Sequence, residues 1–295
     1  MILQKFMVLL LGLLSTMSII AAELSNIDMS YRRVLPLENG SNFRDAGDYP
    51  TIDGKRVIRG ELFRSAAMYA IESESDIDYL ENFKFKTVVD LRSNEERELQ
   101  PDRWVLKDKS INYVSHDYSI MNLMSSSSED SSANDEKVDA GNYYQVMHKT
   151  LVPQIKLYFD ALLNEQVPVI LHCSAGQDRT GFISAVLLKL LGVSEDLIYE
   201  DYNLSTDLRR PSIEAGDINY IEKAKTNAFA KLMLSYGAGT PAKQGNPLRT
   251  SDGVPFLKTA LDAIKDDYGS VEKYLKTEIG LSSLDIAQLR ARYTY

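Results

Sequence analysis

The pattern of hydrophobic and polar positions along the chain predicts strands that alternate with helices. Two short apolar runs rich in β-branched residues, 87–91 (TVVDL) and 167–172 (VPVILH), are typical of strands buried in a sheet. Weaker patterns over 57–63 and 111–115 predict two more strands. Residues 24–56 contain turn signals and no sustained pattern, so they are expected to be irregular. Strands that alternate with helices indicate an α/β domain with a mostly parallel central sheet.

Helical spacing and capping residues predict the helices that flank this sheet. Ser73 precedes acidic residues and then apolar residues at helical intervals, which predicts a helix over 73–83. A short helix is expected over 93–99. The amphipathic segment 143–163 predicts a long helix, and Pro153 predicts a kink or a restart within it.

The remainder of the chain is predicted to be a helical C-terminal part. The segment 180–191 (TGFISAVLLKLL) is apolar almost all round, which predicts a helix buried at the centre of the domain. From Ser194 onward the pattern is helical with breaks. Ser270 and Ser282 occupy the positions of N-caps for the last two helices.

Residues 1–22 have the order of a secretory signal peptide. Lys5 is followed by the apolar run 6–20, and Ala21-Ala22 supplies the small residues of a cleavage site. The alternative is an uncleaved membrane anchor, but the run is shorter than the ~20 residues that a spanning helix needs. We therefore expect an exported protein, periplasmic or secreted, with no stable membrane insertion after cleavage.

The mature chain, 23–295, is predicted to be a single domain with a polar flexible insertion at 125–139 (SSSSEDSSANDEKVD). This insertion has almost no large apolar side chain, so it cannot contribute to a hydrophobic core. Two interpretations stay open for it. It is either a mobile surface loop or a flap that covers the functional site.

Composition and charge exclude several classes of protein. Of the 295 residues, 44% are hydrophobic and 25% are charged, which excludes collagen-like, multi-span and wholly disordered chains. The formal net charge of −9 disfavours nucleic acid as a partner, because an acidic chain repels phosphate backbones. With a single cysteine and three histidines, neither an intrachain disulfide nor a metal site built from these residues is expected. No cofactor is predicted.

The segment 172–181 (HCSAGQDRTG) carries the strongest chemical signal, between a predicted strand and a predicted helix. In this context the loop N–H groups and the first turn of the helix converge on one point and form an anion site. Cys173 lies at its base, where the helix dipole favours the thiolate. Arg179 presents a planar fork to two phosphate oxygens. These are the parts needed for metal-free nucleophilic attack on a phosphoryl group. The predicted phosphate-binding residues are Ser174, Ala175, Gly176, Gln177, Asp178 and Arg179.

Each of these residues also has a purely structural interpretation. Cys173 is also compatible with a small core residue, Arg179 with a salt bridge at a helix start, and His172 with a buried histidine. However, the string H-C-x-x-G-x-x-R-T-G has seven specified positions, and at ~5% usage each a chance match in this chain is about one in a million or rarer. The pattern therefore favours a functional loop.

The segment HCSAGQDRTG resembles the Cys-x5-Arg signature of protein tyrosine phosphatases. Other stretches resemble a bacterial tyrosine phosphatase family, the one whose loop usually reads HCxxGKDR. These stretches are 42–47 (NFRDAG), 62–66 (LFRSA), 89–92 (VDLR) and 281–293 (LSSLDIAQLRARY), and Glu95, Glu96 and Pro101-Asp102 follow the third of them. The resemblance extends from about Asn42 to Tyr295 and implies one tyrosine-phosphatase-like domain. It implies that Cys173 is the nucleophile, that Arg179 binds phosphate and that Asp178 is the general acid.

One position departs from the family pattern. Gln177 replaces a lysine that is associated in the family with activity on phosphoinositides as well as phosphotyrosine. The leading hypothesis is thus a phosphomonoester hydrolase for phosphotyrosine proteins or small phosphomonoesters that forms a phosphocysteine. The alternatives are a phosphoinositide or inositol-phosphate phosphatase, a catalytically inactive phosphate-binding module, and a sulfur transferase.

Three aspartates are candidates for the general acid. Asp178 lies in the loop beside Arg179, and the resemblance favours it. Asp117 follows the predicted strand 111–115, where many tyrosine phosphatases carry this residue on a separate loop. Asp90 ends the predicted strand 87–91, and we expect it to be a structural carboxylate rather than the proton donor.

Overall fold

The computed structural model describes residues 32–126, 140–236 and 247–295. The predicted signal peptide 1–22 lies outside the described residues, as do residues 127–139 of the predicted insertion. Residues Val34–Tyr295 form one compact unit. That 23–295 is a single domain stays a prediction.

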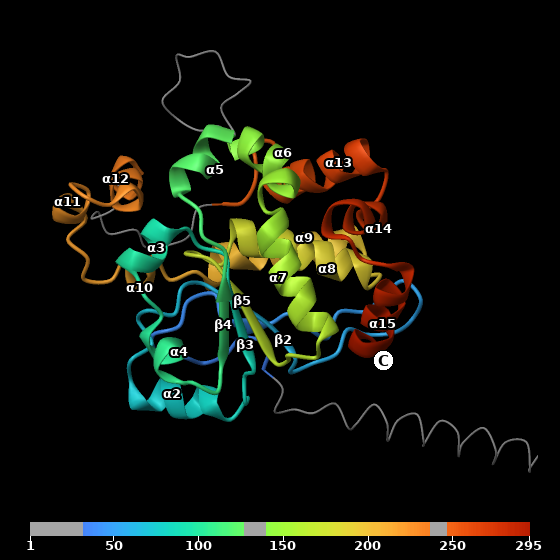
Figure 1. Cartoon of the computed structure of the whole chain (residues 1–295), viewed down its shortest axis with the longest axis horizontal. Coiled ribbons are helices and arrows are strands. Elements are labelled where there is room, and N and C mark those ends of the chain that lie inside the picture. Colours follow the sequence, from blue (N-terminus) through green and yellow to red (C-terminus); the bar gives the residue numbers. More distant parts are fainter. Residues whose placement is uncertain (1–31, 127–139, 237–246) are drawn as a thin grey trace, which may run out of the picture. The chain divides into compact units, whose positions relative to one another are not determined.

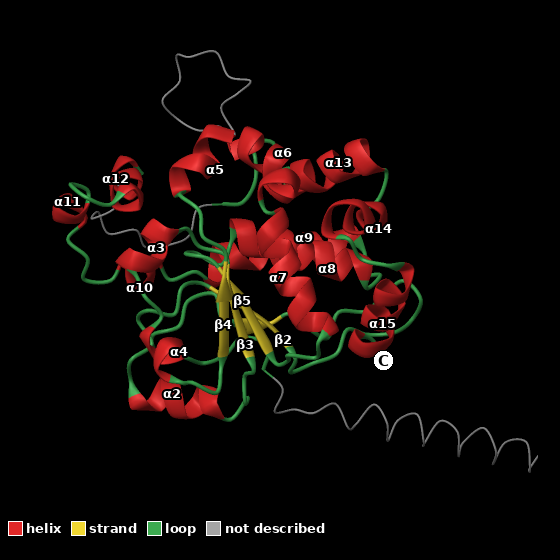
Figure 2. Ribbon diagram, viewed as in Figure 1, coloured by secondary structure: helices red, strands yellow, loops and turns green. Residues whose placement is uncertain are grey.

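A five-stranded sheet lies at the centre of the described part of the chain (Figure 2). Its strands are β1 (Arg44–Asp45), β2 (Leu62–Ser65), β3 (Thr87–Asp90), β4 (Asn112–Ser115) and β5 (Val169–His172). Their order is β1-β2-β5-β3-β4. Strands β2, β5, β3 and β4 are parallel, and β1 pairs with β2 in the antiparallel direction. The predicted mostly parallel sheet is confirmed.

Helices cover the sheet and make up nearly all of the C-terminal part (Figure 1). The helices before the predicted phosphate-binding segment 172–181 are α2 (Glu74–Glu81), α3 (Asn94–Leu99), α4 (Arg103–Lys107), α5 (Ile120–Ser126), α6 (Ala140–Thr150) and α7 (Val152–Leu163). Those after it are α8 (Asp178–Leu190), α9 (Glu195–Leu208), α10 (Pro211–Ala215), α11 (Tyr220–Lys223), α12 (Ala228–Ser235), α13 (Phe256–Tyr268), α14 (Val271–Tyr274), the π-helix η1 (Leu275–Ile279) and α15 (Ser283–Tyr293).

Both faces of the sheet are buried, because successive side chains of a strand point to opposite sides. Val89 and Leu171 lie in the larger hydrophobic core together with residues of α7 and α8. Their neighbours Val88 and Ile170 lie in a smaller core with residues of α2 and α4. Helices on both faces explain why these strands are continuous apolar runs in the sequence.

Local signals predicted the ends of several helices correctly. The Ser73 side chain caps α2 by accepting a hydrogen bond from the Asp76 N–H. Pro153 lies in the first turn of α7, so the predicted long helix is interrupted and restarts as two helices, α6 and α7. Ser270 and Ser282 cap α14 and α15. Each of these signals acts within one turn of the chain, which is why the sequence alone sufficed.

Two predictions for the N-terminal region were wrong in detail. Strand β1 lies within 24–56, which was expected to be irregular. The strand expected over 57–63 begins only at Leu62, and Val57 makes an isolated bridge to Thr294 at the other end of the chain. In addition, the sequence did not indicate helices α4 and α5. Two-residue strands and helices of one or two turns depend on tertiary contacts and are too short to show a clear periodicity.

The strand register brings the carboxyl ends of the parallel strands to one level. His172, the last residue of β5, is paired with Ser65 on β2 and with Asp90 on β3. Asp90 is in turn paired with Ser115 at the end of β4. In open α/β sheets, ligands bind beyond this edge, and Cys173 is the first residue past it.

Candidate active site

The predicted phosphate loop lies at this carboxyl edge, between β5 and α8. Cys173 directly follows β5 and is buried, with 2% of its surface exposed. Helix α8 begins at Asp178 and has Arg179 in its first turn. Gly176 has a φ of +63°, and a Cβ there would lie 2.3 Å from the Ser65 carbonyl oxygen. The loop therefore needs glycine at this position.

Side chains from the N-terminal segment hold the carbonyl groups of the loop. Asn42 Nδ2 donates hydrogen bonds to the carbonyl oxygens of Ala175 at 3.0 Å and Gly176 at 2.9 Å. Arg64 Nη2 also donates to the Gly176 carbonyl, at 2.9 Å. Across a planar trans peptide the next N–H points away from the carbonyl, so these contacts turn loop N–H groups toward the opposite side. An anion on that side meets main-chain donors.

Asp201 of α9 neutralises two buried arginines behind the loop. Its carboxylate accepts hydrogen bonds from Arg44 Nε at 3.1 Å, from Arg64 Nη1 at 2.5 Å and from Tyr49 Oη at 3.0 Å. Burial alone would raise the pKa of Asp201, but the two arginines outweigh it and hold this pKa well below its usual range. Burial and the neighbouring Arg64 lower the pKa of Arg44 to about 10. These ion pairs fix the side chains that hold the loop.

Asp201→Asn is expected to lower the free energy of unfolding by about 3–5 kcal/mol, because it leaves two buried arginines without their carboxylate. Because the pKa of Asp201 is lower in the folded state than in the unfolded state, its ionised carboxylate stabilises the fold fully above the ordinary aspartate pKa of about 3.9. This contribution to the free energy of unfolding is lost as the pH falls below that value. The variant should therefore lose less stability than the wild type on acidification below that pKa. Urea unfolding across this pH range measures both effects.

Asp262→Asn serves as the control for this prediction, because Asp262 pairs with Lys258 on the surface of α13 and both side chains are about half exposed. Its removal should leave the free energy of unfolding nearly unchanged. A similar loss in both variants would contradict the role given to Asp201.

Arg179 is held by Glu96, which lies in α3 and is fully buried. Arg179 Nη1 donates to Glu96 Oε2 at 2.7 Å, and Nη2 donates to Oε1 at 2.6 Å. Nη1 also donates to Tyr118 Oη at 2.8 Å, and Ser174 Oγ donates to Glu96 Oε1 at 2.5 Å. Burial would lower the pKa of Arg179, but Glu96 raises it well above its usual value. Arg179 is therefore permanently charged.

These contacts leave one edge of the Arg179 guanidinium for a ligand. Within the described residues, no hydrogen bond uses its Nε–H, and only one uses Nη2. A guanidinium carries five N–H donors in a planar fork. The Nε–H and the second Nη2–H are the pair suited to two oxygens of one phosphate.

The three candidate acids occupy different environments. Asp178 lies in the loop, and its Oδ1 accepts a hydrogen bond from Tyr144 Oη at 2.5 Å. The Asp117 side chain is 84% exposed and pairs with Arg97 at 2.6 Å. Asp90 is fully buried and ion-paired with Arg92. Of the three, Asp178 alone belongs to the predicted phosphate-binding segment, as the first residue of α8, and its role as the acid stays a prediction.

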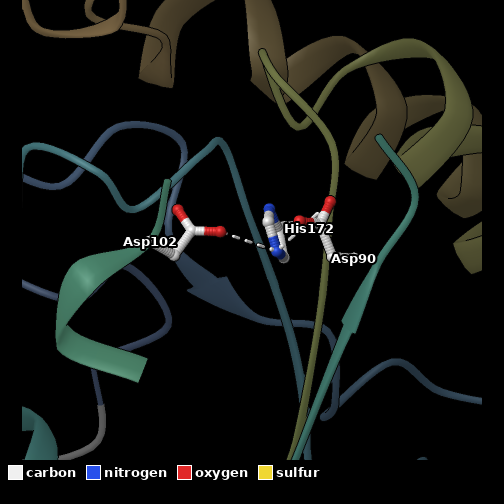
Figure 3. A group of neighbouring side chains, drawn as sticks. All are labelled: Asp90, Asp102 and His172. Atoms are coloured by element: carbon white, nitrogen blue, oxygen red, sulfur yellow. Dashed lines mark ion pairs between the residues drawn. The ribbon is translucent and has the colours of Figure 1, made fainter. Parts of the chain in front are cut away.

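Asp90, Asp102 and His172 form a buried cluster (Figure 3), and His172 directly precedes Cys173 in the sequence. His172 Nε2 lies 3.4 Å from Asp102 and 3.7 Å from Asp90. Although the three residues have the spacing of metal ligands, Arg92 Nη2 already pairs with both carboxylates. Burial opposes ionisation of Asp90, but Arg92 and His172 hold its pKa well below the usual range. The guanidinium thus supplies the positive charge that a metal would bring, and the cluster braces the ends of β3 and β5.

Comparison with known proteins identifies the family. The model of the tyrosine phosphatase family matches residues 35–295. The chain belongs to this family. It is 26% identical over 285 residues to the triple specificity protein phosphatase PtpB of Mycobacterium tuberculosis, covering 87% of this chain and 98% of that protein. It is 30% identical over 248 residues to a tyrosine-protein phosphatase of Nostoc commune, covering 80% of this chain and 75% of that protein.

The similarity to solved structures is lower than the similarity to these relatives. The core catalytic domain of the PP-IP phosphatase SIW14 of S. cerevisiae is 19% identical, with a TM-score of 0.32. The match covers 67% of this chain and 96% of that chain.

Gln177 is the position at which this member of the tyrosine phosphatase family departs from the usual loop. The side chain is buried, and its Oε1 accepts a hydrogen bond from Arg209 Nη1 at 2.6 Å. Arg209 also pairs with Glu214 through its Nη2, at 2.5 Å. A cation therefore reaches the loop beside Gln177, but a carboxylate neutralises it.

Several residues of the site had no assigned role in the sequence analysis. Asn42 and Glu96 lie in stretches that resemble the family, but only the structure shows that they hold the loop and Arg179. Tyr118, Tyr144 and Arg209 lie outside every motif recognised in the sequence. All of them reach the loop from other parts of the chain, so local spacing contains no signal for them.

Proposed function

We propose that this tyrosine phosphatase family member is a cysteine-dependent phosphomonoester hydrolase that acts on phosphotyrosine. The observation that carries the proposal is the geometry around Cys173. The nucleophile lies at the base of a loop whose carbonyls are held away by Asn42 and Arg64, and Arg179 is fixed beside it by Glu96. This arrangement provides a nucleophile, an anion site and a permanent cation at one point.

The proposed reaction proceeds in two displacements. The Cys173 thiolate attacks phosphorus in line, so the S–P bond forms while the P–O bond breaks and its electron pair goes to the leaving oxygen. Asp178 protonates that oxygen. Arg179 and the loop N–H groups hold the non-bridging oxygens. Water then attacks phosphorus, Asp178 accepts a proton from it, and the S–P bond breaks to return the thiolate.

Aromatic side chains beside the loop support an aryl phosphate as substrate. Burial raises the pKa of Tyr143 well above its usual value, and its hydroxyl also responds to the charges of Arg179, Asp178 and Cys173. Tyr143 is half-buried on α6, and Tyr118 contacts Arg179. Rings in these positions pack favourably against the ring of a phosphotyrosine.

The charge around Gln177 favours phosphotyrosine over the phosphoinositide alternative. An inositol lipid with several phosphates needs extra positive charge at the rim of the loop. Here the loop residue is a neutral amide, and Glu214 neutralises the nearby Arg209.

An activity assay with purified protein tests the proposal. We expect hydrolysis of p-nitrophenyl phosphate that EDTA does not inhibit, and then faster hydrolysis of a phosphotyrosine peptide than of a phosphoserine peptide or a phosphoinositide. Phosphate binding without turnover would instead indicate an inactive binding module. Preferential hydrolysis of the phosphoinositide would establish the alternative substrate class.

We also propose that the protein is exported. The order of Lys5, an apolar run and Ala21-Ala22 supports this. Separately, among the residues from 32 onward that the structure describes, no helix has both the length and the apolar character needed to cross a bilayer. Protein recovered from its native host is expected to begin near Glu23, as measured by mass spectrometry of the N-terminal peptide. Intact Met1 in a membrane fraction would contradict export and support an anchor.

A further inference from the structure

Two buried tyrosines connect the interior of the domain to Asp178. Tyr202 Oη, on α9, donates a hydrogen bond to Tyr144 Oη at 2.6 Å. Tyr144, on α6, donates in turn to Asp178 Oδ1 at 2.5 Å. The two tyrosines are 0% and 1% exposed. The reaction described above assigns no role to either hydroxyl.

Both hydrogen bonds are donated in the direction of the Asp178 carboxylate. Burial and the charge of Asp178 raise the pKa of both tyrosines well above the usual value, so each remains a neutral phenol with one hydrogen to donate. A carboxylate without a proton can only accept, so the hydrogen of Tyr144 is directed at Asp178 Oδ1.

Packing fixes the rings independently of their hydroxyls. The Tyr144 ring lies edge-on to Tyr202, with a centroid separation of 6.3 Å, and tilted against Phe256 at 5.9 Å. Gly181, in the loop-to-helix motif, leaves room for Tyr202, because a Cβ there would come within 2.8 Å of the Tyr202 ring. A phenylalanine at either tyrosine position therefore preserves the ring contacts and removes only the hydrogen bonds.

We propose that Tyr144, oriented by Tyr202, is a positioning residue that keeps the transferable proton of Asp178 on Oδ2. The proposal rests on the proposed function, in which Asp178 is the acid. With Oδ1 occupied by the Tyr144 hydroxyl, the neutral acid carries its proton on Oδ2 and passes it to the leaving oxygen. The resulting carboxylate keeps the hydrogen bond at Oδ1, and Oδ2 later accepts the proton of the attacking water.

The test measures kcat/KM for aryl phosphates whose phenols differ in acidity, because this ratio reports the steps up to loss of the phenol. Tyr144→Phe is expected to reduce kcat/KM about 10-fold for phenyl phosphate, a part of the effect of general acid catalysis, and less than about 2-fold for esters of strongly acidic phenols. Tyr202→Phe should show the same selectivity to a smaller degree. If Tyr144→Phe does not fold, Tyr202→Phe carries the test.

Tyr293→Phe is the matched control. Tyr293 is equally buried, and its hydroxyl donates to the Leu162 carbonyl oxygen of α7 at 2.7 Å rather than to a residue of the loop. The Tyr293→Phe substitution should lower the melting temperature as much as Tyr144→Phe does. Its effect on kcat/KM should not depend on the leaving group. In an Asp178→Asn background, Tyr144→Phe should cause no further selective loss, because the two residues act as one unit.

A uniform loss across all leaving groups in Tyr144→Phe, or no loss, would overturn the positioning role. Such a result is distinct from failure of the proposed function. If Asp178→Asn is itself unselective while Cys173→Ser is inactive, the phosphatase mechanism holds and the acid lies elsewhere.

Discussion

Cys173→Ser is expected to abolish turnover while leaving the anion site intact. A serine hydroxyl is not ionised at neutral pH, and the proposed mechanism contains no general base that would remove its proton. The value of kcat/KM for p-nitrophenyl phosphate should therefore fall by at least about 10⁴-fold. The loop N–H groups, Arg179 and Glu96 are unchanged by the substitution. Vanadate or phosphate should therefore still raise the melting temperature, by an amount that follows the ligand concentration relative to Kd.

The two measurements together separate chemistry from folding. An inactive variant that no longer responds to vanadate would indicate a collapsed loop rather than a missing nucleophile. Hydrolysis retained at wild-type rates by Cys173→Ser would contradict the phosphocysteine mechanism altogether.

Asp178→Asn is expected to have the second largest effect, and the size of that effect should depend on the leaving group. Expulsion of a basic phenolate requires a proton, whereas a very acidic phenol leaves without one. We expect kcat/KM to fall by about 10²–10³-fold for phenyl phosphate and by much less for esters of strongly acidic phenols. The acid limb of the pH profile of kcat should change as well.

Asp117→Asn is the comparison for this experiment, because Asp117 is the next candidate and is mostly exposed beside Arg97. Its kcat/KM should remain close to the wild-type value for every leaving group. A uniform loss in Asp178→Asn, combined with a selective loss in Asp117→Asn, would transfer the role of acid to Asp117 and make Asp178 a residue that organises the loop.

The elements predictable from the sequence are those whose cause is local. Strands β3 and β5 are runs of apolar residues, and helix α8 is apolar on nearly all sides. The segment 172–181, which contains the loop between β5 and α8, was also predictable, because its ten residues are contiguous and its chemistry depends on spacing. Serine caps and the interruption at Pro153 belong to the same class, since each acts within one turn.

The parts that the sequence did not indicate depend on residues far apart in the chain. Asn42 binds Ala175 across 133 positions, and Glu96 binds Arg179 across 83. Tyr144 lies 34 residues before Asp178 and reaches it from a different helix. Buried asparagines, glutamates and tyrosines are common in cores, and only three-dimensional proximity distinguishes those that support a site.

The central claim is that phosphate transfers to Cys173, and trapping the intermediate tests it most directly. The enzyme is mixed with an excess of a rapidly reacting aryl phosphate and quenched in denaturant within the first turnovers, and its peptides are analysed by mass spectrometry. The account predicts one added phosphoryl group on the peptide that contains Cys173, and none in Cys173→Ser. A phosphoryl group on another residue, or turnover with no modified peptide at any quench time, would contradict it.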